Sequence, residues 1–317
     1  MWFVYVIGSS ILWALMGLIY RKGALDMKTN EKYVPFKFSI AAGVVCVPIV
    51  AIYLLIREED FSIWESFVRF YPFTLYSFFN VAVCTLSFVG NMYNEASVES
   101  PLENLDGFGL VLLSLAFVFF GKAESVWEVL TPRIIVGLVS ITVGFLLLAA
   151  IREKEAQLAQ SGKKKHFWQA GAGALIVPLV YAFMEAGETV VTGLAVDKTY
   201  GYELPEGDAI IIFGSVYVLL TVVMWLFLLF KEKRPYNPFA KGRRLMLLAS
   251  TCDNIGIVLY YFAMAINSVV TDGSLAAYPV LTMILGHIFL KEKLSWKQYV
   301  CLALVIAGAV LIGLEMA

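Results

Sequence analysis

Ten long apolar runs constrain the fold of this 317-residue chain more than any other feature of its sequence. An apolar helix of about 20 residues crosses the ~30 Å hydrocarbon layer of a membrane. Within that layer only helices and closed barrels satisfy every backbone amide, and these runs lack the alternation of barrel strands. The runs lie near residues 2–20, 33–56, 72–94, 101–120, 132–151, 168–196, 209–230, 245–266, 274–290 and 298–316.

Composition agrees with a membrane-embedded chain, because 60% of the residues are hydrophobic and soluble domains rarely exceed half. We therefore predict an all-α polytopic protein of about ten transmembrane helices. We expect it in the cell membrane as a multi-pass protein, which for a prokaryote is the cytoplasmic (inner) membrane. The net charge of −1 argues against a nucleic-acid partner. No P-loop, HExxH or GxSxG motif occurs, so we expect no enzyme, cofactor or metal site.

The two halves of the chain share one layout. A first half over 1–151 and a second half over 168–317 flank a charged linker, 152–167. Aligning 12–23 with 180–191 places Trp13 on Tyr181 and Met16 on Met184. Aligning 97–108 with 268–279 continues the match. After a seven-residue length difference in the following loop, Gly137 and Gly144 fall on Cys301 and Gly308. Five spans per half is an odd number, so the second half enters the membrane upside down. Such inverted repeats are typical of transporters that work by alternating access.

The loop charges predict an orientation. Lys and Arg number 18 in the loops 21–32, 152–167, 231–244 and 291–297, and only 5 in the opposite loops 57–71, 121–133 and 197–208. The positive-inside rule places the first set in the cytoplasm and both termini outside.

Ionisable and amide residues inside the spans are the candidate functional groups, because a charged side chain at a helix centre costs roughly 2.5–3.5 kcal/mol. Glu185 and Glu188 share one helix face at i,i+3 spacing, and their repulsion favours protonation of one of them. Asp253 and Asn254 lie in the eighth span, and Asp106 and Asn91 lie in or beside the third and fourth. Hydrogen bonding between helices, or capping in the case of Asp106, is the alternative role for each.

Four aromatic residues are candidates for an amine-binding wall through cation–π contacts. They are Trp13, Tyr181, Tyr260 and Tyr278. Because Phe, Tyr and Trp make up 15% of this chain, packing or an interfacial belt is the competing role for any one of them.

The C-terminal stretch YPVLTMILGHIFLKEKLSWKQYVCLALVIAGAVLI resembles the closing helix pair of EamA-type members of the drug/metabolite transporter superfamily. Pro279, Glu292, Gln298 and Gly308 carry this resemblance, and the opening span with Trp13 extends it. The resemblance implies ten helices in two inverted five-helix repeats and transport of metabolites, amino acids, amines, drugs or nucleotide sugars. Two features depart from the family: Phe108 stands opposite Pro279, and the family usually keeps both termini in the cytoplasm.

We therefore predict a secondary active transporter of a small cationic or zwitterionic solute, working by alternating access and coupled to protons, as a monomer or homodimer. Its partners are the solute, protons and the lipid bilayer. An exchanger of anionic or nucleotide-linked solutes is the first alternative, and it needs a basic cavity that only Lys37 approaches. An integral membrane lipid or prenyl transferase, and a receptor or adaptor, are less favoured.

Overall fold

The computed structural model describes residues 1–28, 33–57, 62–81, 107–159, 172–289, 291 and 294–316, and in these ranges all regular structure is helical. Seven of the described helices are long and apolar enough to cross a membrane. The predicted class, an all-α membrane protein, is therefore confirmed. These spans lie in α1 (Trp2–Lys28), α2 (Val34–Ile56), α8 (Pro132–Ala159), α10 (Glu206–Glu232), α11 (Arg244–Ile266) and α14 (Trp296–Gly313), and in residues Ser268–Phe289. α9 (Ala172–Val196) is a further long helix.

Shorter helices complete the bundle. α6 (Gly107–Phe119) is an apolar helix, and residues 71–81 are helical up to the edge of the described range. α12 (Ser268–Leu275) and α13 (Tyr278–Phe289) follow one another within one span. α3 (Ile63–Arg69) and α7 (Val126–Val129) lie in the connections, with single 3₁₀ turns at Lys241–Arg243 and Leu314–Met316.

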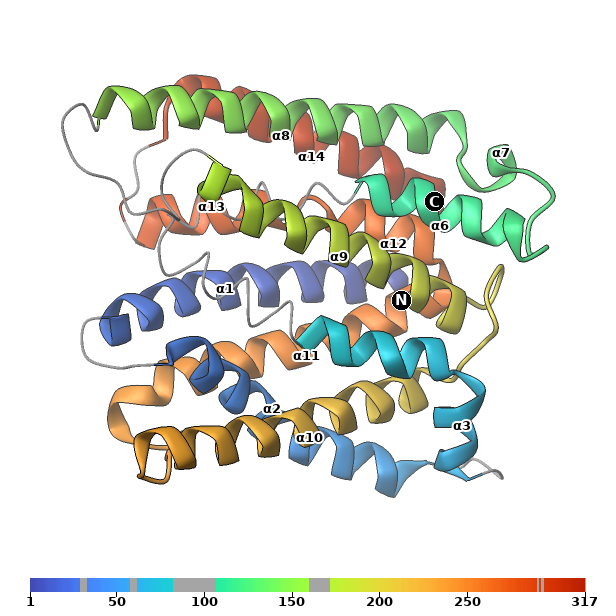
Figure 1. The fold of residues 1–317 in the computed structure, drawn as a ribbon. Coiled ribbons are helices and arrows are strands. Elements are labelled where there is room, and N and C mark those ends of the chain that lie inside the picture. The colour runs from blue at the N-terminus through green and yellow to red at the C-terminus, as the bar shows by residue number, and fades with distance from the viewer. Residues whose placement is uncertain are drawn as a thin grey trace.

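The long helices run roughly parallel to one axis, and both termini lie at the same end of the bundle (Figure 1). The α2–α3 and α9–α10 connections lie at that end, whereas the α10–α11 connection lies at the opposite end. The loops that are poor in lysine and arginine, as far as the structure describes them, therefore lie at the end with the termini. The described parts of the loops that are rich in lysine and arginine lie at the opposite end. The end that faces the cytoplasm stays a prediction from the loop charges.

The first predicted linker boundary differs from the structure. α8 continues through Ala159, so the linker predicted for 152–167 begins as two further helical turns. The sequence REKEAQLA consists of strong helix formers, which explains why the helix extends beyond its apolar part. Residues 160–167 lie outside the described ranges.

The ninth span also differs, because the helical structure begins at Ser268, before the predicted run 274–290. α12 begins at Ser268, where the Asn267 side chain accepts a hydrogen bond from the Val270 amide. The helix is interrupted by a turn at Ala276 and Ala277, and α13 then starts with Pro279 in its first turn. Proline lacks an N–H and its ring clashes with a continuous helix, which accounts for the break. The interruption brings residues 268–275 into the protein interior.

α8 and α14 cross at glycines. A Cβ atom on Gly308 would lie 2.6 Å from the backbone oxygen of Gly137, and one on Gly137 would lie 2.7 Å from the oxygen of Gly308. Small residues allow helix backbones in membranes to approach this closely. Two helical turns further along, Gly144 faces the backbone of Cys301.

The helix contacts between the two halves come in matching pairs. α1 packs on α11, and the helix at 71–81 packs on α9 through Tyr76 and Gly187. α1 also packs on α13, as α6 does on α9. The α2–α10 contact joins the second span of each half, and the α8–α14 contact joins the fifth span of each half. α1 and α9, the first helix of each half, run in opposite directions (Figure 1).

Candidate functional site: an acidic and aromatic central cavity

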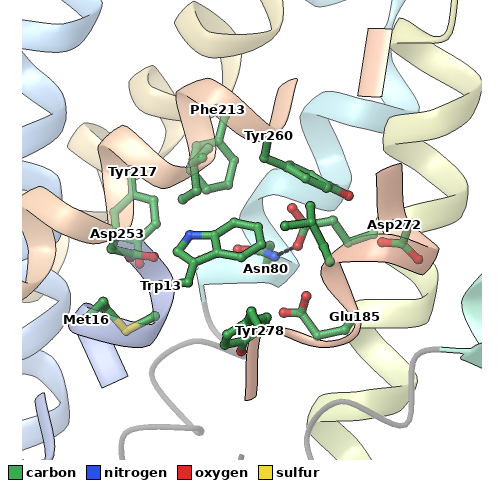
Figure 2. Close-up of a pocket in the computed structure, with 13 residues that line it drawn as sticks. Trp13, Met16, Asn80, Glu185, Phe213, Tyr217, Asp253, Tyr260, Asp272 and Tyr278 are labelled. Carbon is green, nitrogen blue, oxygen red and sulfur yellow. Dashed lines mark hydrogen bonds between the residues drawn. The ribbon is translucent and has the colours of Figure 1, made fainter. Parts of the chain in front are cut away.

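A cavity of about 90 Å³ lies at the centre of the bundle. A single water needs about 10–15 Å³ on this scale, so the cavity has room for several waters or a small solute. Described residues of seven helical segments line it, from α1, 71–81, α9, α10, α11, α12 and α13. The lining comprises Trp13, Met16, Asn80, Glu185, Glu188, Phe213, Tyr217, Asp253, Ile257, Tyr260, Asp272, Leu275 and Tyr278 (Figure 2).

α9 supplies two of the four carboxylates. Glu185 and Glu188 both reach the cavity, as their i,i+3 spacing predicts. Asn80, buried on the helix at 71–81, donates a hydrogen bond from Nδ2 to the Glu188 carboxylate. The hydroxyl of Tyr76, one turn earlier, donates to the backbone oxygen of Met184. These two contacts hold the acidic face of α9 toward the cavity.

α11 supplies Asp253 but turns its neighbour away. Asp253 lines the cavity within electrostatic range of Glu185. Asn254 does not line it: its Oδ1 accepts from Cys46 Sγ at 2.8 Å, and its Nδ2 donates to the Ser250 oxygen at 2.8 Å. Adjacent helix residues point about 100° apart, so only one of this pair can face the cavity. The structure thus places Asn254 in the packing between α11 and α2, away from the predicted site.

Asp272 is the carboxylate that the sequence reasoning missed. It lies on α12 and lines the cavity with 8% of its surface exposed. Thr189 Oγ1 donates to its Oδ1 at 3.0 Å, whereas its Oδ2 has no hydrogen-bond partner among the described residues. Asp272 lies just before the ninth predicted apolar run, 274–290. The signal that could have found it is Asn267, a favourable N-cap residue immediately before SVVTDGSL.

Three of the predicted aromatic residues meet in the cavity. The Trp13 ring centroid lies 5.5 Å from that of Tyr260 and 5.5 Å from that of Tyr278, the latter edge to face. Gly256 makes room for this cluster, since a Cβ atom there would lie 2.6 Å from Trp13 Nε1. We call Trp13, Tyr260 and Tyr278 the aromatic cluster.

Three other predicted site residues cannot be placed. Asp106 and Asn91 lie outside the described residues. Tyr181 belongs to α9, but its side chain also falls outside what the structure describes.

The charges of the cavity are one-sided. Its described lining holds four carboxylates and no lysine, arginine or histidine. Lys37, which the anion-exchange alternative needs, is instead buried against α10, where its Nζ lies 2.8 Å from Glu232 Oε1 and 5.6 Å from the Tyr236 ring centroid. Low-dielectric walls of one charge sign concentrate ions of the opposite sign. The cavity therefore suits cations.

A polytopic helical bundle with a polar cavity at its centre is the architecture of many helical membrane transport proteins. Residues 168–314 match the model of the EamA-like transporter family. This part of the chain is an EamA-like domain of the drug/metabolite transporter superfamily, and the protein is a non-enzymatic, multi-pass membrane transporter of small solutes. The family implies about ten transmembrane helices, as predicted from the apolar runs.

Comparison with solved structures supports the fold across both halves. One crystal structure of another protein matches with a TM-score of 0.62, covering 97% of this chain and 96% of its own. The two sequences are 14% identical, so the likeness establishes the fold alone. No curated protein matches this sequence significantly.

Proposed function

We propose that this transporter moves a small cationic or zwitterionic organic solute, such as an amine, amino acid or drug, coupled to protons. The observation that carries the proposal is the central cavity, where Glu185, Glu188, Asp253 and Asp272 come together without a basic residue in the described lining. Ionised carboxylates in a membrane interior are costly unless a counter-charge reaches them. A proton and a solute cation are counter-charges that water-filled access can deliver.

The aromatic cluster supports an amine as the cationic part. Trp13 and Tyr278 stand beside the carboxylates, and their ring faces attract an ammonium group by about 0.5–2 kcal/mol each when water is excluded. A zwitterion would place its ammonium group at these residues. An anionic solute would meet four like charges.

The matching contacts between halves support alternating access by two inverted repeats, 1–151 and 168–317. The alignment pairs Gly137 with Cys301 and Gly144 with Gly308. A twofold relation between the halves then requires that a contact between Gly137 and Gly308 be accompanied by one between Gly144 and Cys301, and both contacts are present. Two related halves that enclose one cavity can rock about it to expose either side. We place both termini outside, on the loop charges.

Transport by the purified protein in proteoliposomes tests this proposal. Radiolabelled choline, putrescine and lysine serve as probes of a quaternary amine, a diamine and an amino acid. We expect at least one to accumulate under a pH gradient and to stop accumulating when a protonophore is added. The Glu185→Gln, Asp253→Asn double variant should lose this accumulation, whereas Glu128→Gln, on exposed α7, should retain it. Full activity of the double variant, or gradient-driven movement of anions alone, would overturn the proposal.

A further inference from the structure

We infer that Asp272 is the residue that binds the coupling proton, separate from the carboxylates that hold the solute; this inference rests on the proposed proton-coupled transport. Asp272 lines the cavity and is more than nine-tenths buried, and its buried Oδ2 has no hydrogen-bond partner among the described residues. A buried ionised oxygen without a donor is unfavourable, and the group neutralises instead. The proton that neutralises the carboxylate enters through the cavity and forms an O–H bond on Oδ2. When the cavity opens to the other side, that O–H bond breaks, the proton is released and the carboxylate is restored.

Asp272 lies across the cavity from Asp253. Figure 2 shows Asp253 and Asp272 at opposite sides of the cavity, with Trp13 between them. A solute cation held by Trp13, Tyr278 and Asp253 therefore leaves Asp272 available to a proton. Glu185 lies within electrostatic range of both aspartates, so the charge at one site influences occupancy at the other.

The charged and titratable groups that face Asp272 come from two of the helices packed on α12. α9 contributes Glu185 and Glu188, and α11 contributes Asp253 and Tyr260, whose hydroxyl interacts electrostatically with Asp272. α1 lines the cavity with Trp13 and Met16, α6 contains no charged residue, and neither α8 nor α14 contributes to the described lining. Among the described residues that line the cavity, every neighbour that can be charged is negative, so a proton on Asp272 relieves repulsion.

Asp272 also contacts α9 and the interruption between α12 and α13. Its Oδ1 accepts from Thr189 Oγ1 on α9, and its backbone oxygen accepts from the Ala276 amide at the break between α12 and α13. Protonation changes the charge at one end of the α9–α12 contact, beside the point where the span is interrupted. Interrupted helices of this kind typically form the substrate and coupling-ion sites of transporters. Proton binding at Asp272 thereby biases the position of α12 relative to α9.

Asp272→Asn tests the inference, because asparagine approximates the size of a protonated aspartate but releases no proton. Two readouts in proteoliposomes are compared for the choline, putrescine or lysine probe that the wild type transports. We expect accumulation under a pH gradient to be lost, while counterflow exchange at equal pH keeps its KM within about twofold. The matched variant Asp253→Asn, on the solute side, should raise the counterflow KM about tenfold or more.

The outcomes separate the two proposals. If the wild type accumulates no probe under a pH gradient, the proposed function fails and this inference with it. If the wild type accumulates a probe and Asp272→Asn does so equally, only the role of Asp272 is overturned. Loss of counterflow in a folded Asp272→Asn protein also overturns it, since the residue would then hold solute. Should that variant not fold, Thr189→Val removes one donor from the carboxylate. For Thr189→Val we expect the pH at which accumulation is half-maximal to rise, while counterflow stays unchanged. If that pH does not move, the inference is overturned.

Discussion

The crossing of α8 and α14 gives a stability prediction whose size follows from the structure. A methyl group added by Gly308→Ala would lie 2.6 Å from the Gly137 oxygen, 2.8 Å from Ile141 Cγ1 and 3.1 Å from the Ile141 amide nitrogen. Two of these three atoms belong to the backbone, so no side-chain rotation relieves the clash. The helices must separate by several tenths of an ångström, and overpacking of this kind typically costs about 1–3 kcal/mol.

Thermal unfolding of the purified protein in detergent measures this cost. The matched control is Gly313→Ala in the same helix, where the nearest atoms to an added Cβ are 3.6 and 3.8 Å away, at ordinary contact distance. Replacing a helical glycine by alanine gains roughly 0.5–1 kcal/mol from backbone entropy, and both variants share this gain. We therefore expect Gly308→Ala to unfold at a lower temperature than the wild type, and Gly313→Ala at an equal or higher one. Equal unfolding temperatures for the two variants would refute the close backbone contact.

Two further substitutions address the cavity wall and the start of α12. Gly256→Ala places a Cβ 2.6 Å from Trp13 Nε1 and displaces the indole from the aromatic cluster. We expect the transport KM for an amine probe to rise about threefold to thirtyfold, whereas Gly23→Ala, with 3.7 Å of clearance, should leave it unchanged; an unaltered KM in Gly256→Ala would contradict a role for Trp13. Asp197→Ala removes a buried carboxylate that accepts from the amides of Thr199, Tyr200 and Ser268 and from Ser268 Oγ. Leaving these donors unpaired should destabilise the protein by at least about 1–3 kcal/mol, and unchanged unfolding in detergent would exclude this anchor for α12.

The candidate site was partly predictable. Glu185, Glu188 and Asp253 stood out because each is an acid within an apolar run, and the structure brings all three to one cavity. Asp272 was not found, because hydropathy averages over a window and the SVVTDGSL segment is polar enough to look like a loop. Asn254 was selected as the neighbour of Asp253, but a one-residue step turns a helical side chain by about 100°. The structure places it against Cys46 instead.

The partners of the buried charged residues could not be predicted from the sequence either. Lys37 was a candidate base for the anion-exchange alternative, and only the packing of α2 on α10 brings Glu232 to within 2.8 Å of it. At the other end of the same helix pair, Arg57 Nε lies 2.7 Å from Asp208 Oδ1, and Ser66 Oγ donates to the same carboxylate. These ion pairs join residues more than 150 positions apart in the chain. Local composition holds no information about such partners.

By itself, the sequence determined which segments enter the membrane as helices, because the free energy of that transfer depends on the apolar content of a contiguous stretch about 20 residues long. It also indicated the paired organisation of the halves and the presence of acids that lipid cannot accommodate. Only the tertiary structure decided which acids share a cavity, how the span containing Asp272 is interrupted, and where Lys37 finds its counter-charge. Those outcomes depend on the rotation and crossing of helices that are distant in the chain, which are set by close contacts such as the one between Gly137 and Gly308.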